Sequence, residues 1–197
     1  MCVALSSVLR GPLGHVEAEH LLCETLENVR AARGDLDVNA LLIIDRIGQI
    51  LEEQGRLADA EARYREALPG WRATKGVSDA HTLICTGLLV GVLKAQGKMD
   101  DAEPLLRETM DGCRRTLGDS HPTTLTSTRN MAALLQAQGK LGEAEPLFRE
   151  ALDGYRRTLG DSHPSTLNTA NTLASLLQDQ GKLGEAEPLW ATRTPTR

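Results

Sequence analysis

A repeat of fixed length runs through almost the whole chain and limits the possible fold more than any other feature. The tripeptide Gln-Gly-Lys or Gln-Gly-Arg occurs four times, with its glycine at Gly55, Gly97, Gly139 and Gly181, so each interval (97 − 55, 139 − 97, 181 − 139) is 42 residues. The segment TLGDSHPTTL at 116–125 returns as TLGDSHPSTL at 158–167. Such a period is typical of solenoids, in which each repeat packs on its neighbours.

The register of this repeat divides the chain into full and incomplete units. The full units are expected at 32–73, 74–115 and 116–157. Residues 5–19 align with 173–187, so 1–31 is interpreted as a partial repeat containing the end of one helix and a second helix. Residues 158–190 are expected to form a truncated repeat and 191–197 a disordered tail, because the sequence there departs from the repeat.

Each unit contains two patterns of helical periodicity. In the third full unit, the first pattern (helix A, 122–138) has apolar residues at helical spacing and starts with Pro122, which is tolerated in a first helical turn. Gly139 ends it, since glycine adopts a left-handed conformation without steric cost. The second pattern (helix B, 141–158) has acidic residues at its start and Arg156 and Arg157 at its end, the order that a helix dipole favours. The fold class predicted is therefore all-α.

Small residues mark the points where helix A and helix B are expected to cross. Ala144 and its equivalents on helix B face Ala132 and Ala174 on helix A. The chain has one Phe, two Tyr and two Trp, so its core must consist mainly of aliphatic side chains, which favours helix packing. Replacing Ala144 by Leu is expected to overpack the crossing and cost about 1–3 kcal/mol.

Composition and charge exclude several functional classes. The formal net charge is −5, with both signs interspersed, which disfavours a nucleic-acid partner. No apolar run is long enough to span a bilayer, and the apolar start at Met1 lacks the basic residues and cleavage site of a signal peptide. The four cysteines are far apart, form no metal-ligand spacing and fit a reducing, cytoplasmic location. No metal or cofactor is expected.

The repeat resembles a known family. Leu173-Ala174 and Leu177 in helix A, the glycine of the turn, and Ala186 followed four residues later by Trp190 are similar to the tetratricopeptide pattern. The 42-residue length and the string GKLGEAEPL…LGDSHP resemble the long repeats of kinesin light chains. The resemblance implies an α-solenoid of right-handed antiparallel helix pairs, a tetratricopeptide repeat superhelix that acts as a protein-binding scaffold.

The resemblance also implies where a peptide would bind. In that family the A helices line a concave groove, and asparagines of helix A contact the backbone of an extended peptide. Asn130 and Asn171 match those asparagines, whereas the equivalent pairs of the earlier units are Asp45-Arg46 and Gly87-Leu88. The register places these residues in the groove: Leu42, Asp45, Gln49, Glu52, Ile84, Gly87, Gly91, Lys94, Thr126, Arg129, Ala133, Gln136, Asn168, Asn171, Ser175 and Gln178.

The groove is therefore expected to be polar, with a mildly acidic first end and two cations near its middle. We hypothesise that it holds an extended, acidic protein or peptide, whose backbone bonds to amides and whose carboxylates bond to cations. The alternative is a solvated face without a specific ligand. The candidate binding residues are Lys94, Arg129, Asn130, Gln136, Asn168 and Asn171.

No catalytic residue is expected. Asp119, Ser120 and His121, like their equivalents at 161–163, are consecutive in a turn and cannot converge on one substrate atom as a hydrolase triad does. The paired arginines at 114–115 and 156–157 are interpreted as helix ends rather than phosphate ligands, and Cys23 and Cys113 as buried side chains. Two alternatives to a free-standing scaffold stay open: a repeat fragment of a larger regulatory protein such as a repeat-bearing NTPase, and a hydrolase.

Overall fold

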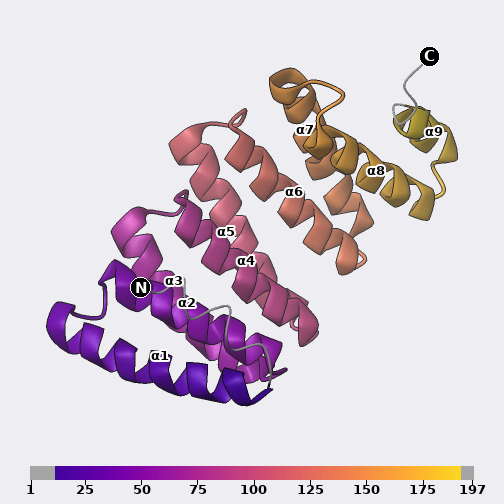
Figure 1. The fold of residues 1–197 in the computed structure, drawn as a ribbon. Coiled ribbons are helices and arrows are strands. Elements are labelled where there is room, and N and C mark those ends of the chain that lie inside the picture. Colours follow the sequence, from indigo (N-terminus) through magenta and orange to yellow (C-terminus); the bar gives the residue numbers. More distant parts are fainter. Residues whose placement is uncertain (1–11, 192–197) are drawn as a thin grey trace. The chain divides into compact units, whose positions relative to one another are not determined.

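The computed structural model describes residues 12–191, with the side chains of 14–189 (Figure 1). Over this part of the chain every regular element is an α-helix, which confirms the predicted all-α class. The helices are α1 (Pro12–Arg33), α2 (Val38–Glu53), α3 (Leu57–Lys75), α4 (Ala80–Ala95), α5 (Met99–Leu117), α6 (Pro122–Ala137), α7 (Leu141–Leu159), α8 (Pro164–Asp179) and α9 (Leu183–Ala191). Residues 1–11 of the predicted partial repeat and 192–197 of the predicted tail lie outside the described residues.

The chain forms two compact units, Met1–Lys98 and Met99–Arg197. In the first unit α1, α2, α3 and α4 pack one against the next, and in the second α5 to α9 do the same. The even-numbered helices are the predicted A helices and the odd-numbered ones the predicted B helices. Short turns make successive helices antiparallel, so each unit is a stack of helix pairs, the architecture of an α-solenoid (Figure 1).

The turn from each A helix to the next B helix has the same geometry. After α6, Gly139 has a φ of +77°, and its N–H donates to the carbonyl of Gln136 at 2.9 Å. The Lys140 N–H donates to the carbonyl of Leu135, also at 2.9 Å. These two bonds form a Schellman motif, which needs a residue with positive φ directly after the helix. The repeated Gln-Gly-Lys/Arg tripeptide is therefore a helix stop.

The turn from each B helix to the next A helix is also built from repeated residues. Gly160 has φ 85° and ψ 166°, a backbone conformation that only glycine adopts readily. The first residue of the following helix is preceded by an N-cap side chain. Asp37 and Asp79 accept the N-cap hydrogen bond in the first unit, whereas the imidazoles of His121 and His163 accept it in the second.

The core lies where A and B helices cross. Ala132, Ala144 and Ala174 are fully buried, as the sequence predicts, and Phe148 and Tyr155 fill the space beside them. One close crossing involves Gly154 of α7. A Cβ atom at that position would lie 2.2 Å from a methyl group of Leu125 on α6, so any larger residue would force the Leu125 side chain to move.

Candidate peptide-binding surface

The outward side of α6 and α8 forms a continuous polar surface in the second unit, which we call the second A-helix face. Its side chains are exposed or half-buried and recur every three or four residues, so they share one side of each helix. The face consists of Thr126, Arg129, Asn130, Ala133 and Gln136 on α6 and Asn168, Asn171, Thr172, Ser175 and Gln178 on α8. Five of the six predicted binding residues thus lie on one face.

The second A-helix face has no carboxylate: α6 contains none, and α8 contains none from Pro164 to Gln178. Arg129 is its one charged side chain over these stretches, and its guanidinium donates to the amide oxygen of Asn130 at 3.4 Å. Among the described residues, no hydrogen bond involves the side-chain amides of Gln136, Asn168 or Asn171. These amides therefore have unused donors and acceptors, and the local charge is positive.

Lys94, the sixth predicted binding residue, lies on α4 in the first unit. Its side chain is exposed and forms no salt bridge with any described residue. The exposed side of α2 and α4, which we call the first A-helix face, differs in character from its counterpart. It carries Leu42, Ile84, Gly87 and Gly91 at the predicted positions, so it is largely apolar over α4.

Asp45 does not lie in a polar groove, and this expectation was wrong. Its side chain is only 9% exposed, and its Oδ2 accepts a hydrogen bond of 2.7 Å from Trp71 Nε1. Burial raises the pKa of the Asp45 carboxyl, although the hydrogen bond from Trp71, the nearby Cys85 thiol and the charge of His81 lower it in part. Because the indole N–H of a buried tryptophan needs an acceptor, Asp45 turns toward Trp71 instead of toward solvent.

Repeated ion pairs between neighbouring B helices were not predicted. The Lys140 ammonium, in the turn before α7, lies 2.7 Å from Glu103 of α5, and Arg107 lies 2.7 Å from the same carboxylate. These two cations lower the pKa of Glu103 to about 2. The same ion pair joins Arg56 to Glu19, Lys98 to Glu61 and Lys182 to Glu145. We call this series the ion-pair ladder.

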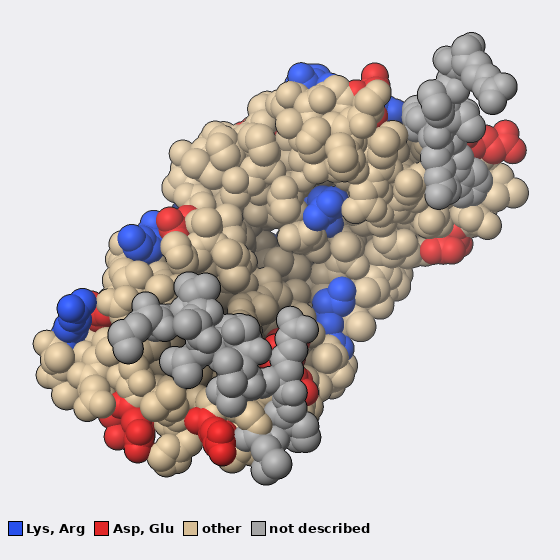
Figure 2. All heavy atoms as spheres, in the orientation of Figure 1, with Lys and Arg blue, Asp and Glu red and all other residues tan. Residues whose placement is uncertain are grey.

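The residues of the ladder belong to the sequence motifs that define the repeat. The cation follows the glycine of the Gln-Gly-Lys/Arg tripeptide, and the carboxylate is the last residue of an Asp-Ala-Glu or Glu-Ala-Glu segment, so both recur every 42 residues. This shared 42-residue period could have indicated the ion pairs from the sequence. Because these charges are paired with each other, they are structural rather than ligand-binding groups. In Figure 2 the basic and acidic side chains are accordingly interspersed, and no large visible area has one sign.

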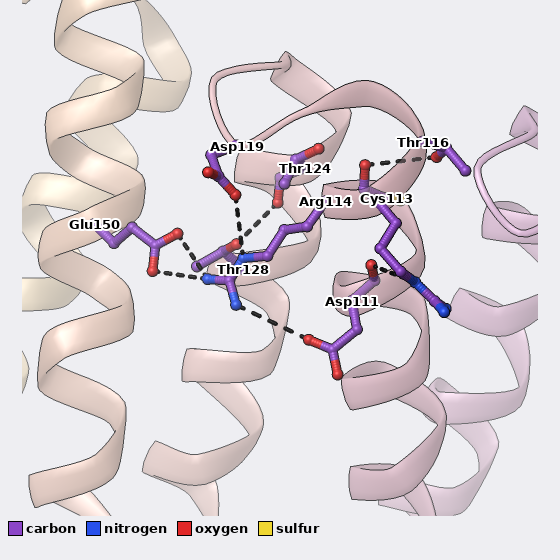
Figure 3. A network of polar contacts seen from close by, with 9 residues as sticks. Asp111, Cys113, Arg114, Thr116, Asp119, Thr124, Thr128 and Glu150 are labelled. Atoms are coloured by element: carbon purple, nitrogen blue, oxygen red, sulfur yellow. Dashed lines mark hydrogen bonds and ion pairs between the residues drawn. The ribbon is translucent and has the colours of Figure 1, made fainter.

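The paired arginines finish the B helices, as the sequence predicts. Arg114 lies in the last turn of α5 and forms two hydrogen bonds, at 2.7 and 2.8 Å, with the carboxylate of Glu150 on α7. Figure 3 shows its guanidinium between Glu150, Asp119 and Asp111. Three surrounding carboxylates leave Arg114 no unpaired charge for a phosphate.

The Asp-Ser-His segment also has a structural role. His121 Nδ1 accepts a hydrogen bond of 3.2 Å from the Thr123 N–H and so caps α6. Cys113 is fully buried, as predicted, whereas Cys23, which was also expected to be buried, is half-exposed. Nothing in the described ranges groups three His, Cys, Asp or Glu side chains as metal ligands.

The described helices are all too short or too polar to cross a membrane. Two models of the tetratricopeptide repeat match the sequence, one over 82–157 and 125–189 and the other over 41–81. These segments cover more than half of the 197 residues. The chain belongs to the tetratricopeptide repeat family. The search of curated proteins gave no match.

Solved tetratricopeptide structures share this fold. The putative kinesin light chain TPR-like repeats of Podosopora anserina are 23% identical, with a TM-score of 0.75 over 91% of this chain and 85% of that chain. BtubC (BKLC) of P. vanneervenii is 19% identical, with a TM-score of 0.75 over 93% and 78%. NprR, solved with its cognate peptide NprX, is 16% identical, with a TM-score of 0.52 over 87% and 47%. The fold is thus that of kinesin-light-chain-like repeats.

Proposed function

We propose that this tetratricopeptide repeat protein is a non-catalytic scaffold that binds an extended, acidic peptide segment of a partner protein on its second A-helix face. The free amides of Gln136, Asn168 and Asn171 on a face without carboxylates carry the proposal. Amides supply both donors and acceptors, so they can follow the alternating N–H and C=O groups of a peptide backbone.

Arg129 gives the surface its preference for acidic ligands. It is the one cation on this face and is half-buried, which strengthens its interaction with a ligand carboxylate. Asn130 lies next to it and receives its hydrogen bond. In NprR, the same fold holds a peptide, which supports a peptide as the class of ligand. Lys94 belongs to the first unit and is not part of the proposed surface.

A peptide array followed by affinity measurements tests this role. The immobilised array is probed with the full chain and with Arg129→Glu, and peptides captured by the full chain are then titrated by fluorescence anisotropy. Reversal of the charge is expected to weaken acidic peptides about tenfold or more, because a charge-assisted hydrogen bond is replaced by repulsion.

Arg157→Glu is the matched control. It changes net charge equally, but Arg157 lies on α7 and its guanidinium bonds to the carbonyl of Asp153, away from the proposed surface. Equal affinity of wild-type protein and Arg129→Glu for every captured peptide would exclude the proposal. Asn171→Ala is expected to weaken acidic and neutral peptides alike, since the amide bonds to backbone.

A further inference from the structure

The buried carboxyl of Asp45 in the first unit is only half satisfied. Its Oδ2 accepts the hydrogen bond from Trp71, but its Oδ1 is buried and has no hydrogen-bond partner. A buried acceptor without a partner is unfavourable, and a buried charge without a counter-charge more so. Such groups in native proteins call for an explanation, and a bound ligand is one.

The immediate neighbours of Asp45 do not neutralise it. Trp71 is fully buried and stacks on the His81 ring with a centroid separation of 4.9 Å. The His81 ring nitrogen already lies 3.2 Å from Asp79. Cys85 is fully buried, and burial and the nearby Asp45 charge raise the pKa of its thiol, so it supplies no charge. The carboxyl therefore lies between α2, α3 and α4 without an ion pair to any residue whose side chain the structure describes.

Exposed apolar side chains lie on α2 and α4, the helices that carry Asp45 and Cys85. Leu42 precedes Asp45 by one helical turn on α2 and is 43% exposed. Ile84 is adjacent to Cys85 on α4 and is 57% exposed. The two residues occupy the same position in consecutive repeats, 42 residues apart. They are large hydrophobic groups in contact with water, and side-chain rotation at such exposed positions is fast.

The α4 surface next to Ile84 is open. Gly87 and Gly91 are exposed, and a Cβ atom placed on either would meet nothing within 4 Å. A peptide main chain can thus approach α4 closely over these two turns. Glycine in a helix is unfavourable by about 1 kcal/mol relative to alanine, so two exposed glycines on one side reduce the stability of α4.

We infer that the first A-helix face binds a peptide through a lysine or arginine side chain whose charged group reaches Asp45 Oδ1 after the side chains that cover this buried atom turn aside. The apolar stem of such a side chain would lie against Leu42 and Ile84, as long cationic side chains lie along apolar surfaces, and its charged end would supply the missing partner. The peptide backbone would lie over Gly87 and Gly91. The inference rests on the proposed scaffold role only in taking a peptide as the ligand.

The register supports opposite preferences in the two units. Asp45 and Arg129 are two periods apart and occupy equivalent positions, but one is a carboxylate and the other a cation. The two units are thus expected to prefer ligands of opposite charge.

The indole N–H of Trp71 provides a local readout, because it bonds directly to Asp45. Its resonance in a proton–nitrogen NMR spectrum is assigned with Trp190→Phe. The full chain is titrated with three seven-residue peptides that differ only at the centre, which is lysine, norleucine or glutamate between two leucines. The lysine peptide is expected to shift the Trp71 resonance and to bind about tenfold more tightly than the norleucine peptide.

Asp45→Asn keeps an oxygen for the Trp71 N–H and removes the charge, so the preference for lysine over norleucine is expected to disappear. Ile84→Ser, at an exposed position, is expected to weaken the lysine peptide while leaving the fold intact. n-Butylamine, which has the stem and cation without a main chain, is expected to bind much more weakly than the peptide.

Several results would overturn the inference. They are no shift with the lysine peptide at millimolar concentration, equal affinity for norleucine, or an unchanged preference in Asp45→Asn. Equal binding of n-butylamine would exclude a peptide as the ligand. Arg129→Glu is expected to leave the lysine peptide unaffected, so loss of acidic-peptide capture and loss of lysine binding separate the two proposals.

Discussion

Asp45 and Trp71 illustrate how one buried hydrogen bond changes the role of a register position. The repeat places Asp45 among residues that face outward in the later units, where Arg129 and Asn171 are half-exposed. In the first unit the Trp71 indole N–H donates to the Asp45 carboxyl, which lies buried. In the second unit Tyr155, at the position equivalent to Trp71, bonds to Thr126 instead. A tryptophan N–H only donates, so it requires an acceptor nearby, and Asp45 is that acceptor.

Replacing Asp45 by Asn is expected to stabilise the first unit at neutral pH by about 1 kcal/mol, because the cost of a buried unpaired charge disappears. Burial raises the pKa of the Asp45 carboxyl above 3.8, so the wild-type first unit is most stable when Asp45 is protonated and loses stability as pH rises through the folded pKa. Thermal melts of the wild type and of Asp45→Asn at pH 4 and pH 7 measure this difference in stability.

The control for Asp45→Asn is Asp153→Asn, an exposed aspartate on α7. It is expected to change the melting temperature little at either pH. A lower melting temperature for Asp45→Asn at pH 7 would mean that the charge is compensated within the unit, which contradicts the argument above.

At the scale of single helices, local sequence rules account for nearly all boundaries. Gly139 and Pro122 predict the limits of α6 to within one residue, since positive φ and a missing N–H act locally. The alanines at helix crossings follow from the period alone. The ion-pair ladder and the inward turn of Asp45 could not be predicted in the same way, because each depends on side chains from neighbouring helices. The Gly154 contact with Leu125 likewise appears only when the helices are packed.

Gly154→Ala and Gly142→Ala are expected to have opposite effects in the same helix, α7. At Gly154 a Cβ would overlap Leu125, so the second unit is expected to lose about 1–3 kcal/mol through overpacking. At Gly142 a Cβ would meet nothing within 4 Å, and alanine's higher helix propensity is expected to add a few tenths of a kcal/mol. Urea unfolding measures both; equal effects would contradict the predicted crossing.

At the scale of the whole molecule, the ion-pair ladder repeats through both units. Three of its carboxylates, Glu61, Glu103 and Glu145, are largely buried beside two cations each, whereas the cations are more exposed. The cations lower the pKa of Glu103 from 4.5 to about 2 and also lower that of Glu61 and Glu145. Groups with depressed pKa values stabilise the fold above the unfolded value and lose that contribution as pH falls.

The chain is therefore expected to lose stability between about pH 4.5 and pH 2, and Glu103→Gln is expected to reduce this dependence. At pH 7 the substitution is expected to cost about 0.5–1 kcal/mol, a value limited by the exposure of Lys140 and Arg107 to solvent. Chemical unfolding as a function of pH tests both statements. The control is Glu143→Gln, because Glu143 is exposed on α7. Glu108 of α5 is less suitable, since it has another interaction. If Glu103→Gln loses as much stability as the wild type in acid, the ladder is excluded as the cause of that loss.

The span of the ladder has a consequence for how chains of this kind change in length. The cation and carboxylate of each rung are 37 residues apart, less than one 42-residue period. Insertion or deletion of one whole period therefore leaves every cation with an equivalent carboxylate in the preceding repeat. A duplication of the corresponding stretch of gene would lengthen the chain without leaving an unmatched charge at the junction.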